Sequence, residues 1–164
     1  MRTLTLLRHA KSSWSDSSLA DHERPLSGRG ERDGPVMGQR IAAAGIRPSL
    51  IVSSPAIRAW NTAKIVANEI AYPLEFLQRD SALYLAGLNS LIDFVGRQDE
   101  GFSSIMLVGH NPGLTEFANY LCPGLTNNLP TCGVVSVSMD AETWDLRGDA
   151  SISMAHHNYP KKQL

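Results

Sequence analysis

The sequence has few cysteines, few aromatic residues and almost no net charge. Its two cysteines, Cys122 and Cys132, lack the spacing and the neighbouring histidines of a zinc site, so we expect ordinary buried or half-buried thiols. The formal charge is -1, and the basic residues are scattered instead of alternating with aromatic ones. This composition provides no global field that would attract nucleic acid or an acidic membrane. Any anion chemistry must therefore be local.

Long hydrophobic runs are also missing. No stretch approaches the roughly 20 apolar residues that a membrane-spanning helix needs. The apolar run near the N-terminus, residues 4–7, ends at Arg8 and His9 and is too short for a signal peptide. We therefore expect a cytoplasmic protein that has no membrane and no nucleic acid among its partners.

Apolar runs typical of strands alternate along the chain with segments that have apolar residues at helical spacing. The chain has 164 residues, of which 43% are apolar, and this predicts one domain over residues 1–164. The predicted strands are residues 3–8, 49–54, 74–78, 104–109 and 134–140, with 143–148 as a weaker sixth; the predicted helices are residues 30–44, 55–71, 88–98 and 112–122. This order predicts a three-layer α/β fold, with a mostly parallel central sheet, helices on both faces and a terminal hairpin.

Two predicted strands lead into helices through turns of the same type. Ser54 and Asn111 can each cap a helix, and each is followed by a proline that we expect at the first helical position. This arrangement places Arg58 in the first turn of one helix and His110 just before the other. Helix N-termini present free amides and the positive end of the helix dipole, so both turns favour an anion.

Three strand ends therefore carry basic side chains. The first strand ends in Arg8 and His9, and the other two lead to Arg58 and His110. Because the carboxyl ends of parallel strands line one crevice, we expect these four residues to lie together. Each one alone is more often a surface or packing residue. Together they would repel one another unless an anion were bound, so the pattern favours a phosphate site.

The segments LLRHAKSSW, SSPAIRAWNTA and GHNPGL resemble the three signatures of the histidine phosphatase superfamily, whose fold is called phosphoglycerate mutase-like. The short chain and the segment DHERPLSGRG, residues 21–30, are most similar to the SixA-type phosphohistidine phosphatases. Ala10 replaces the glycine of the usual Arg-His-Gly motif. Residues 80–90 contain no glutamate, the proton donor of the mutase branch, so the resemblance disfavours a mutase.

The resemblance implies a mechanism. His9 would be the nucleophile, and its neutral imidazole would form a covalent phosphohistidine that water hydrolyses. Arg8 and Arg58 would bind the phosphate oxygens, and a protonated His110 would add another donor. These groups can supply the charge that a metal ion supplies elsewhere, and no aspartate cluster suits a metal, so we expect no metal and no cofactor.

The remaining catalytic role is that of the general acid. Asp21 lies three residues before Arg24, on a loop that can fold over the crevice, and it matches the acidic position of the SixA-type pattern. Asp16, Glu23 and Asp80 are the alternatives. Asp21 could instead be a solvated loop carboxylate, but we favour the catalytic role over that interpretation.

The predicted function is that of a phosphatase that removes phosphate from phosphohistidine in a phosphorylated protein. A small phosphate ester is the alternative substrate, because the short loops predict an open site that admits both. A non-catalytic module that binds phosphorylated ligands is the third alternative. The presence of both His9 and His110 argues against it, since binding alone would need only the arginines.

Overall fold

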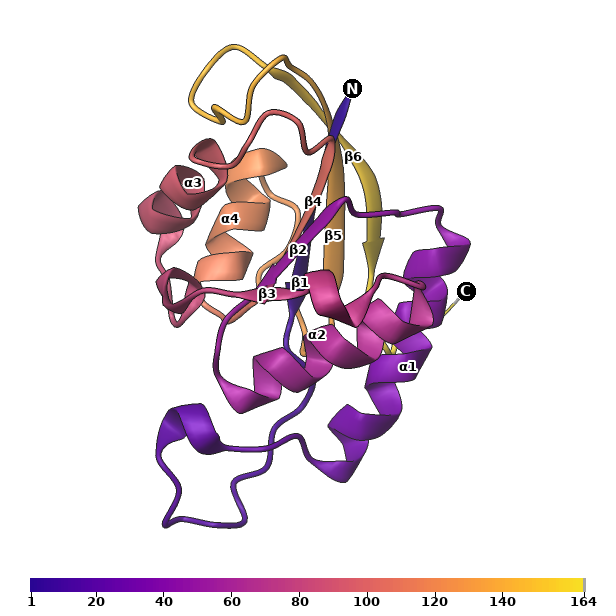
Figure 1. The fold of residues 1–164 in the computed structure, drawn as a ribbon, viewed down its shortest axis with the longest axis vertical. Coiled ribbons are helices and arrows are strands. Elements are labelled where there is room, and N and C mark those ends of the chain that lie inside the picture. The colour runs from indigo at the N-terminus through magenta and orange to yellow at the C-terminus, as the bar shows by residue number, and fades with distance from the viewer. Residues whose placement is uncertain (164) are drawn as a thin grey trace.

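The computed structural model describes residues 1–163, which form a six-stranded sheet (Figure 1). The strands are β1 (Arg2–Arg8), β2 (Leu50–Ser53), β3 (Gln78–Arg79), β4 (Ser104–Gly109), β5 (Val134–Asp140) and β6 (Ser151–Asn158), in the order β3-β2-β4-β1-β5-β6. β1 to β4 run parallel, whereas β5 is antiparallel to β1 and β6 is antiparallel to β5. The predicted α/β fold with a mostly parallel sheet is confirmed.

Helices cover both faces of this sheet. α1 (Gly28–Ala43) and α2 (Ile57–Glu69) lie together on one face, and α3 (Leu88–Gly96) and α4 (Gly113–Leu121) lie together on the other (Figure 1). Short 3-10 helices interrupt the connections: η1 (Asp21–Glu23), η2 (Leu74–Phe76) and η3 (Ser81–Leu83).

Each face of the sheet has its own hydrophobic core. Ile105 and Leu107 of β4 pack in the core beneath α3 and α4, whereas Met106 and Val108 pack in the core beneath α1 and α2. This alternation follows from the two-residue repeat of a strand. Burial on both faces explains the continuous apolar run of β4 and fixes its register, because a shift by one residue would exchange the two cores. The residues that follow β1 and β4 are therefore held in place.

Two predicted strands differ from the structure. Residues 74–78 form η2 and the start of the two-residue strand β3, and residues 143–148 form a loop. Trp144 and Leu146 in that loop are buried, so their alternation imitates a strand although they fill the core from a loop. Trp144 Nε1 donates to the carbonyl of Phe102 at 3.0 Å and fixes the loop. The terminal hairpin is present, but β6 is its second strand.

The two proline turns also differ from the prediction. α2 begins two residues after Pro55, and α4 begins one residue after Pro112, so neither proline is the first helical residue. Ser54 Oγ and Asn111 Oδ1 still accept main-chain hydrogen bonds at these turns, at 3.3 and 3.2 Å. Arg58 is the second residue of α2, as the prediction of a first-turn position requires.

Candidate active site

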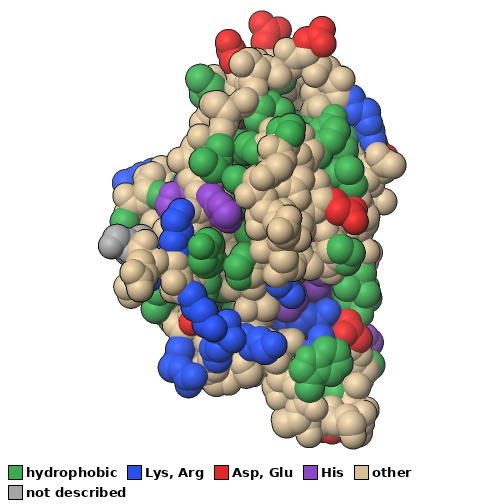
Figure 2. Space-filling model, turned by 180° about the vertical axis from the view of Figure 1, so that it is seen from behind, with side chains coloured by type: hydrophobic (Ala, Val, Ile, Leu, Met, Phe, Trp, Pro, Cys, Tyr) green, Lys and Arg blue, Asp and Glu red, His purple; other side chains and the backbone are tan. Residues whose placement is uncertain are grey.

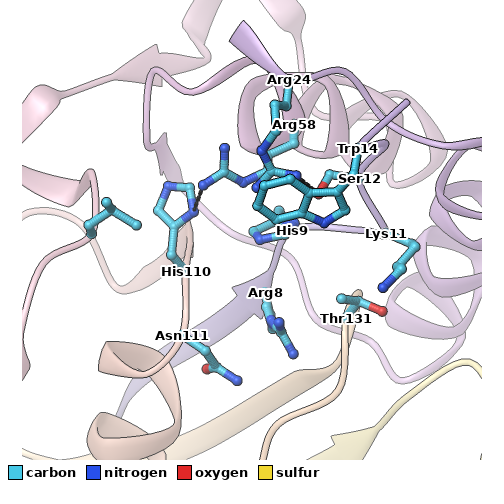
Figure 3. Close-up of a pocket in the computed structure, with 11 residues that line it drawn as sticks. Arg8, His9, Lys11, Ser12, Trp14, Arg24, Arg58, His110, Asn111 and Thr131 are labelled. Carbon is cyan, nitrogen blue, oxygen red and sulfur yellow. Dashed lines mark hydrogen bonds between the residues drawn. The ribbon is translucent and has the colours of Figure 1, made fainter. Parts of the chain in front are cut away.

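A pocket of about 210 Å³ lies where the parallel strands end (Figure 3). Its lining residues are Arg8, His9, Lys11, Ser12, Trp14, Arg24, Arg58, Leu85, His110, Asn111 and Thr131. Figure 2 shows that many Lys, Arg and His side chains gather at the lower end of the molecule, whereas a group of Asp and Glu side chains marks the upper end. The pocket is thus rich in cations although the formal charge of the chain is -1.

The register of the sheet brings the four predicted basic side chains together. Arg8 of β1 pairs with Gly109 of β4, so His9 and His110 emerge side by side, with ring centroids 5.3 Å apart. Arg58 reaches across from α2 and places its Nη2 3.3 Å from His110 Nδ1 (Figure 3). Parallel strands that end at the same level are the reason for this convergence.

His9 is held as a neutral imidazole with one free ring nitrogen. Its Nδ1 lies 2.7 Å from the carbonyl of Ala10, which can only accept, so Nδ1 carries the proton and Nε2 carries the lone pair. Burial lowers the pKa of His9 to about 3, and the positive charges of Arg58 and Arg8 act in the same direction. Only 7% of His9 is exposed. An unprotonated Nε2 is the state that a nucleophile needs.

Arg8 and Arg58 each keep a buried Nε donor free. Arg8 donates from Nη1 to the carbonyl of Leu129 at 2.9 Å, and Arg58 donates from Nη1 to the carbonyl of Asp21 at 2.8 Å. Both Nε atoms are buried, and no group within residues 1–163 accepts a hydrogen bond from them. Burial, followed by the charge of Arg58, lowers the pKa of Arg8. Two close guanidinium groups with unused buried donors fit an oxyanion.

The contacts of His110 define which of its ring nitrogens carries the proton in this arrangement. Its Nδ1 faces the guanidinium of Arg58, which can only donate, so Nδ1 is unprotonated. Its Nε2 therefore carries the proton and donates to Ser54 Oγ at 2.7 Å. Burial, together with the charge of Arg58, lowers the pKa of His110 to about 4. In this arrangement the low pKa keeps the ring neutral at pH 7, and the protonated state expected during phosphoryl transfer stays a prediction.

Asp21 lies at the edge of the site and contacts Arg58 and Arg24. Its Oδ2 accepts from Arg58 Nη2 at 3.0 Å and from the phenol of Tyr84 at 2.5 Å, and its Oδ1 accepts from Arg24 Nη2 at 3.2 Å. The Tyr84 hydrogen bond is the largest influence that lowers the pKa of Asp21, followed by Arg58, to about 2. Asp21 is therefore ionised at neutral pH, whereas the predicted role of general acid needs a protonated carboxyl.

The three alternative acids are engaged elsewhere. Asp16 accepts hydrogen bonds from Ser18, Glu23 accepts from the amide of Ala20, and Asp80 caps η3. None of the three lines the pocket. Asp21 is thus the only one of the four predicted carboxylates that contacts a pocket arginine within residues 1–163.

Arg24 and Tyr84 are site residues that the sequence did not reveal. Arg24 is 7% exposed, and its Nη1 donates to Ser12 Oγ at 2.7 Å. Tyr84 follows η3 and packs edge-on against His110, with ring centroids 5.5 Å apart. The spacing of Asp21 and Arg24, three residues apart, was visible as a signal, but nothing in the sequence marked Tyr84.

The β1–α1 loop is folded tightly against the start of α1. Ser27 caps this helix through its Oγ, which accepts from the amide of Gly30 at 3.2 Å. A Cβ at Gly30 would lie 2.2 Å from the carbonyl oxygen of Lys11, so only glycine allows this approach. The loop residues that line the pocket are held in place by this contact.

Neither a membrane span nor a metal cluster is found in the described part of the chain. None of the helices within residues 1–163 has the length and hydrophobicity to cross a membrane. Over the same residues, no three His, Cys, Asp or Glu side chains come close enough together to hold a metal ion. Cys132 is buried and Cys122 is half-buried, and both are free thiols.

The sequence has a recognisable family and distant relatives. The profile of the histidine phosphatase superfamily (branch 1) matches residues 4–79. An uncharacterized chloroplastic protein of Arabidopsis thaliana is 34% identical over 157 residues, which span 88% of this chain and 69% of that protein. The matched segment of the superfamily contains Arg8, His9, Asp21 and Arg58.

Solved structures share the fold over almost the whole chain. SixA from Agrobacterium tumefaciens has a TM-score of 0.82 at 24% identity, over 97% of this chain and 98% of its own. The protein histidine phosphatase SixA complexed with tungstate has a TM-score of 0.78 at 20% identity, over 96% of this chain and 97% of its own. At this level of identity the likeness establishes the fold.

Proposed function

Because this chain belongs to the histidine phosphatase superfamily, we propose that it transfers the phosphoryl group of a protein phosphohistidine to His9 and then to water. Membership of the superfamily supports a phosphatase with a histidine-dependent mechanism. The protein substrate and the residue roles below are our proposal, and the contacts of the pocket supply the argument for them.

In the first step, the lone pair of His9 Nε2 forms a bond to phosphorus. The bond between phosphorus and the imidazole nitrogen of the substrate breaks, and that nitrogen keeps the electron pair. The hydrogen bond from Nδ1 to Ala10 directs the lone pair to Nε2, and the low pKa keeps it unprotonated at neutral pH. No deprotonation has to precede the attack.

Arg8 and Arg58 would hold the non-bridging oxygens during this transfer. Their buried Nε donors and the planar shape of the guanidinium suit a phosphoryl group. The negative charge of the substrate would raise the pKa of His110, because it offsets the repulsion by Arg58. Once Arg58 turns to the phosphoryl oxygens, His110 Nδ1 is released and can serve as the predicted donor.

The ionised state of Asp21 is the observation that favours phosphohistidine over an alkyl phosphate as the substrate. An alkoxide needs a proton from an acid when it leaves, and Asp21 has a pKa of about 2. The imidazole of phosphohistidine can take its proton from solvent, on the nitrogen far from phosphorus, before the bond to phosphorus breaks. A pocket with a nucleophile and cations but no protonated carboxyl suits this leaving group.

In the second step, water attacks the phosphorus held by His9, and the bond to Nε2 breaks with the electron pair returning to the ring. The carboxylate of Asp21 would accept the proton of this water and pass it to solvent. We therefore keep Asp21 as a catalytic residue but assign it the role of base in this step. The arginines and His110 replace a metal ion, so the proposal includes no cofactor.

Small phosphate esters with acidic leaving groups fit the same two steps and form the second candidate class of substrate. The open pocket, which Trp14 borders with 71% of its surface exposed, admits them as well. A binding module alone would not need the free Nε2 of His9. The location of the protein in the cytoplasm remains a prediction.

Single-turnover rates with three substrates test this function. A phosphohistidine protein and p-nitrophenyl phosphate should transfer their phosphoryl group at least about 100-fold faster than phosphoserine, because only phosphoserine needs an acid. The His9→Ala protein, purified in parallel, is the control for contaminating phosphatases. Comparable rates on phosphoserine would contradict the choice of phosphohistidine, and no transfer from any substrate would contradict the phosphatase itself.

A further inference from the structure

Two exposed apolar side chains border an otherwise polar pocket. Of the 11 residues drawn around it in Figure 3, only Trp14 and Leu85 are apolar. Trp14 is 71% exposed and Leu85 is 55% exposed. A phosphoryl group itself needs charge and donors, which the other lining residues already supply. Ligand pockets combine apolar walls with a few polar groups, so Trp14 and Leu85 are available to contact another part of a ligand.

Trp14 is held in place by Arg24, one of the arginines that line the pocket. The guanidinium carbon of Arg24 lies 3.5 Å from the centroid of the indole ring, in a cation–π contact. Arg24 is in turn fixed by Ser12 and by Asp21, with hydrogen bonds of 2.7 and 3.2 Å. Arg24 occupies one face of the indole, and the high exposure of Trp14 leaves ring surface free for a ligand.

Leu85 is presented by a strained backbone. Its φ is +51°, in the left-handed region that residues with a Cβ seldom adopt. Burial does not account for this conformation, because more than half of the side chain is exposed. Leu85 follows Tyr84, whose phenol binds Asp21, and Asp21 also binds the arginine beneath Trp14. The two loops that carry Leu85 and Trp14 are thus joined through one carboxylate.

We propose that Trp14 and Leu85 form an aromatic clamp, a subsite that binds a flat ring attached directly to the phosphoryl group. The free surface of the indole offers stacking, and Leu85 offers a second apolar contact. This inference rests on the proposed function, because it concerns the group that leaves when His9 is phosphorylated. Among phosphorylated protein side chains, it favours the imidazole of phosphohistidine over the aliphatic chain of phosphoserine. The clamp selects the leaving group, whereas the cations bind the phosphate.

Phosphonates test this selectivity by binding alone. Their carbon–phosphorus bond is not cleaved, so differences in affinity report only contacts with the group attached to phosphorus. Isothermal titration calorimetry would give the Kd of phenylphosphonate, methylphosphonate and inorganic phosphate. The wild type should bind phenylphosphonate about tenfold more tightly than methylphosphonate, from ring burial and stacking. Trp14→Ala should remove most of this preference and change the Kd of inorganic phosphate less than about twofold, since its cationic ligands persist.

Three further variants separate the clamp from general structural effects. Trp14→Phe should keep most of the preference because it retains a ring. Leu85→Gly should relieve the backbone strain, keep or raise the melting temperature, and still reduce the preference for the phenyl group. Phe76→Ala is the matched control: Phe76 is 59% exposed, lies on η2 and does not line the pocket, so the preference should stay at the wild-type value.

The outcomes of these titrations distinguish a failure of the clamp from a failure of the proposed function. Equal affinity of the wild type for phenyl- and methylphosphonate would overturn the clamp while inorganic phosphate still bound, and the proposed function would stand. An equal loss of affinity for all three anions in Trp14→Ala would also overturn it, because Trp14 would then act only through Arg24. If none of the three anions binds to the wild type, both the clamp and the proposed function are overturned.

Discussion

The phenol of Tyr84 and the carboxylate of Asp21 form a hydrogen bond that joins two loops at the edge of the pocket. The bond is 2.5 Å long and reaches Oδ2, the same oxygen that accepts from Arg58. A carboxylate that receives several donors is stabilised in its charged form. Tyr84 therefore acts through Asp21 and keeps that carboxylate ionised beside the cations.

Replacing Tyr84 by Phe tests this relationship. Loss of the hydrogen bond should raise the pKa of Asp21, because the bond is the largest influence that lowers it. If ionised Asp21 is the base for hydrolysis of the phosphorylated enzyme, the acid limb of the pH–rate profile should move to higher pH in Tyr84→Phe. Tyr120→Phe is the matched control, since the phenol of Tyr120 donates to the carbonyl of Leu146 instead. An unchanged acid limb would show that the hydrogen bond from Tyr84 does not influence the catalytic ionisation of Asp21.

Asp21→Asn separates the two catalytic steps. An amide keeps the size of the side chain but cannot accept the proton of water, so hydrolysis of phosphorylated His9 should slow about 100-fold or more. Phosphorylation of His9 by a phosphohistidine protein should change much less. In rapid-quench experiments the variant should therefore show a burst and accumulate acid-labile phosphate. A selective loss in the phosphorylation of His9 would instead identify Asp21 as the general acid.

His9→Ala tests the nucleophile directly. Turnover should fall by at least about 1,000-fold, because loss of a nucleophile removes the covalent route. Inorganic phosphate should still bind, since Arg8 and Arg58 bind neighbouring main-chain carbonyls and not the ring of His9. Wild-type protein quenched in acid or in alkali should retain phosphate only in alkali, as expected of phosphohistidine. Near-wild-type turnover by His9→Ala would show that another group attacks phosphorus.

Chelation tests the independence from metals. Arg8 and Arg58 supply positive charge at the pocket, so turnover in excess EDTA should stay within about twofold of the untreated enzyme. The measurement is the initial rate before and after incubation with EDTA and gel filtration. Restoration of a lost activity by Mg²⁺ or Zn²⁺ would require a different mechanism.

The sequence was most informative about residues that follow the central strands. β1 and β4 are buried on both faces, so their apolar runs mark their ends to within one or two residues. The order of parallel strands and helices then implies one crevice, which is why His9 and His110 could be placed together without a structure. At these positions the apolar pattern of each strand and the order of the strands predict the same location.

Residues whose role depends on approach between loops could not be found in this way. Tyr84 and Asp21 are 63 positions apart and meet only because η3 and η1 reach the same edge of the pocket. The edge strand β6 escaped detection for a related reason: it has one neighbouring strand, and of its residues 151–158 only Asn158 is buried. The protonation of His110 also depends on the position of Arg58, which sequence spacing does not supply.

The two pocket histidines predict a loss of stability in mild acid. Burial lowers the pKa of His9 from 6.5 to about 3 and that of His110 from 6.5 to about 4. Below pH 6.5 the unfolded chain binds protons that the folded chain does not, so each histidine lowers the free energy of unfolding as the pH falls toward its folded pKa. The slope is at most about 1.4 kcal/mol per pH unit for each group.

Urea unfolding between pH 6.5 and 4.5 tests this prediction. Asp21 does not affect the free energy of unfolding in this window, because its contribution is lost only as the pH falls from 3.8 toward 2. His9→Asn keeps a donor that can face the carbonyl of Ala10 but cannot titrate, so the free energy of unfolding should depend less steeply on pH, by up to about 1.4 kcal/mol per unit. His22→Gln, which replaces an exposed histidine of η1, is the matched control for the loss of one histidine outside the pocket. A wild-type stability that stays constant over this window would show that the buried imidazoles remain free to bind protons in the folded protein, and it would remove the basis for treating His9 as a nucleophile that is unprotonated at every pH in the range.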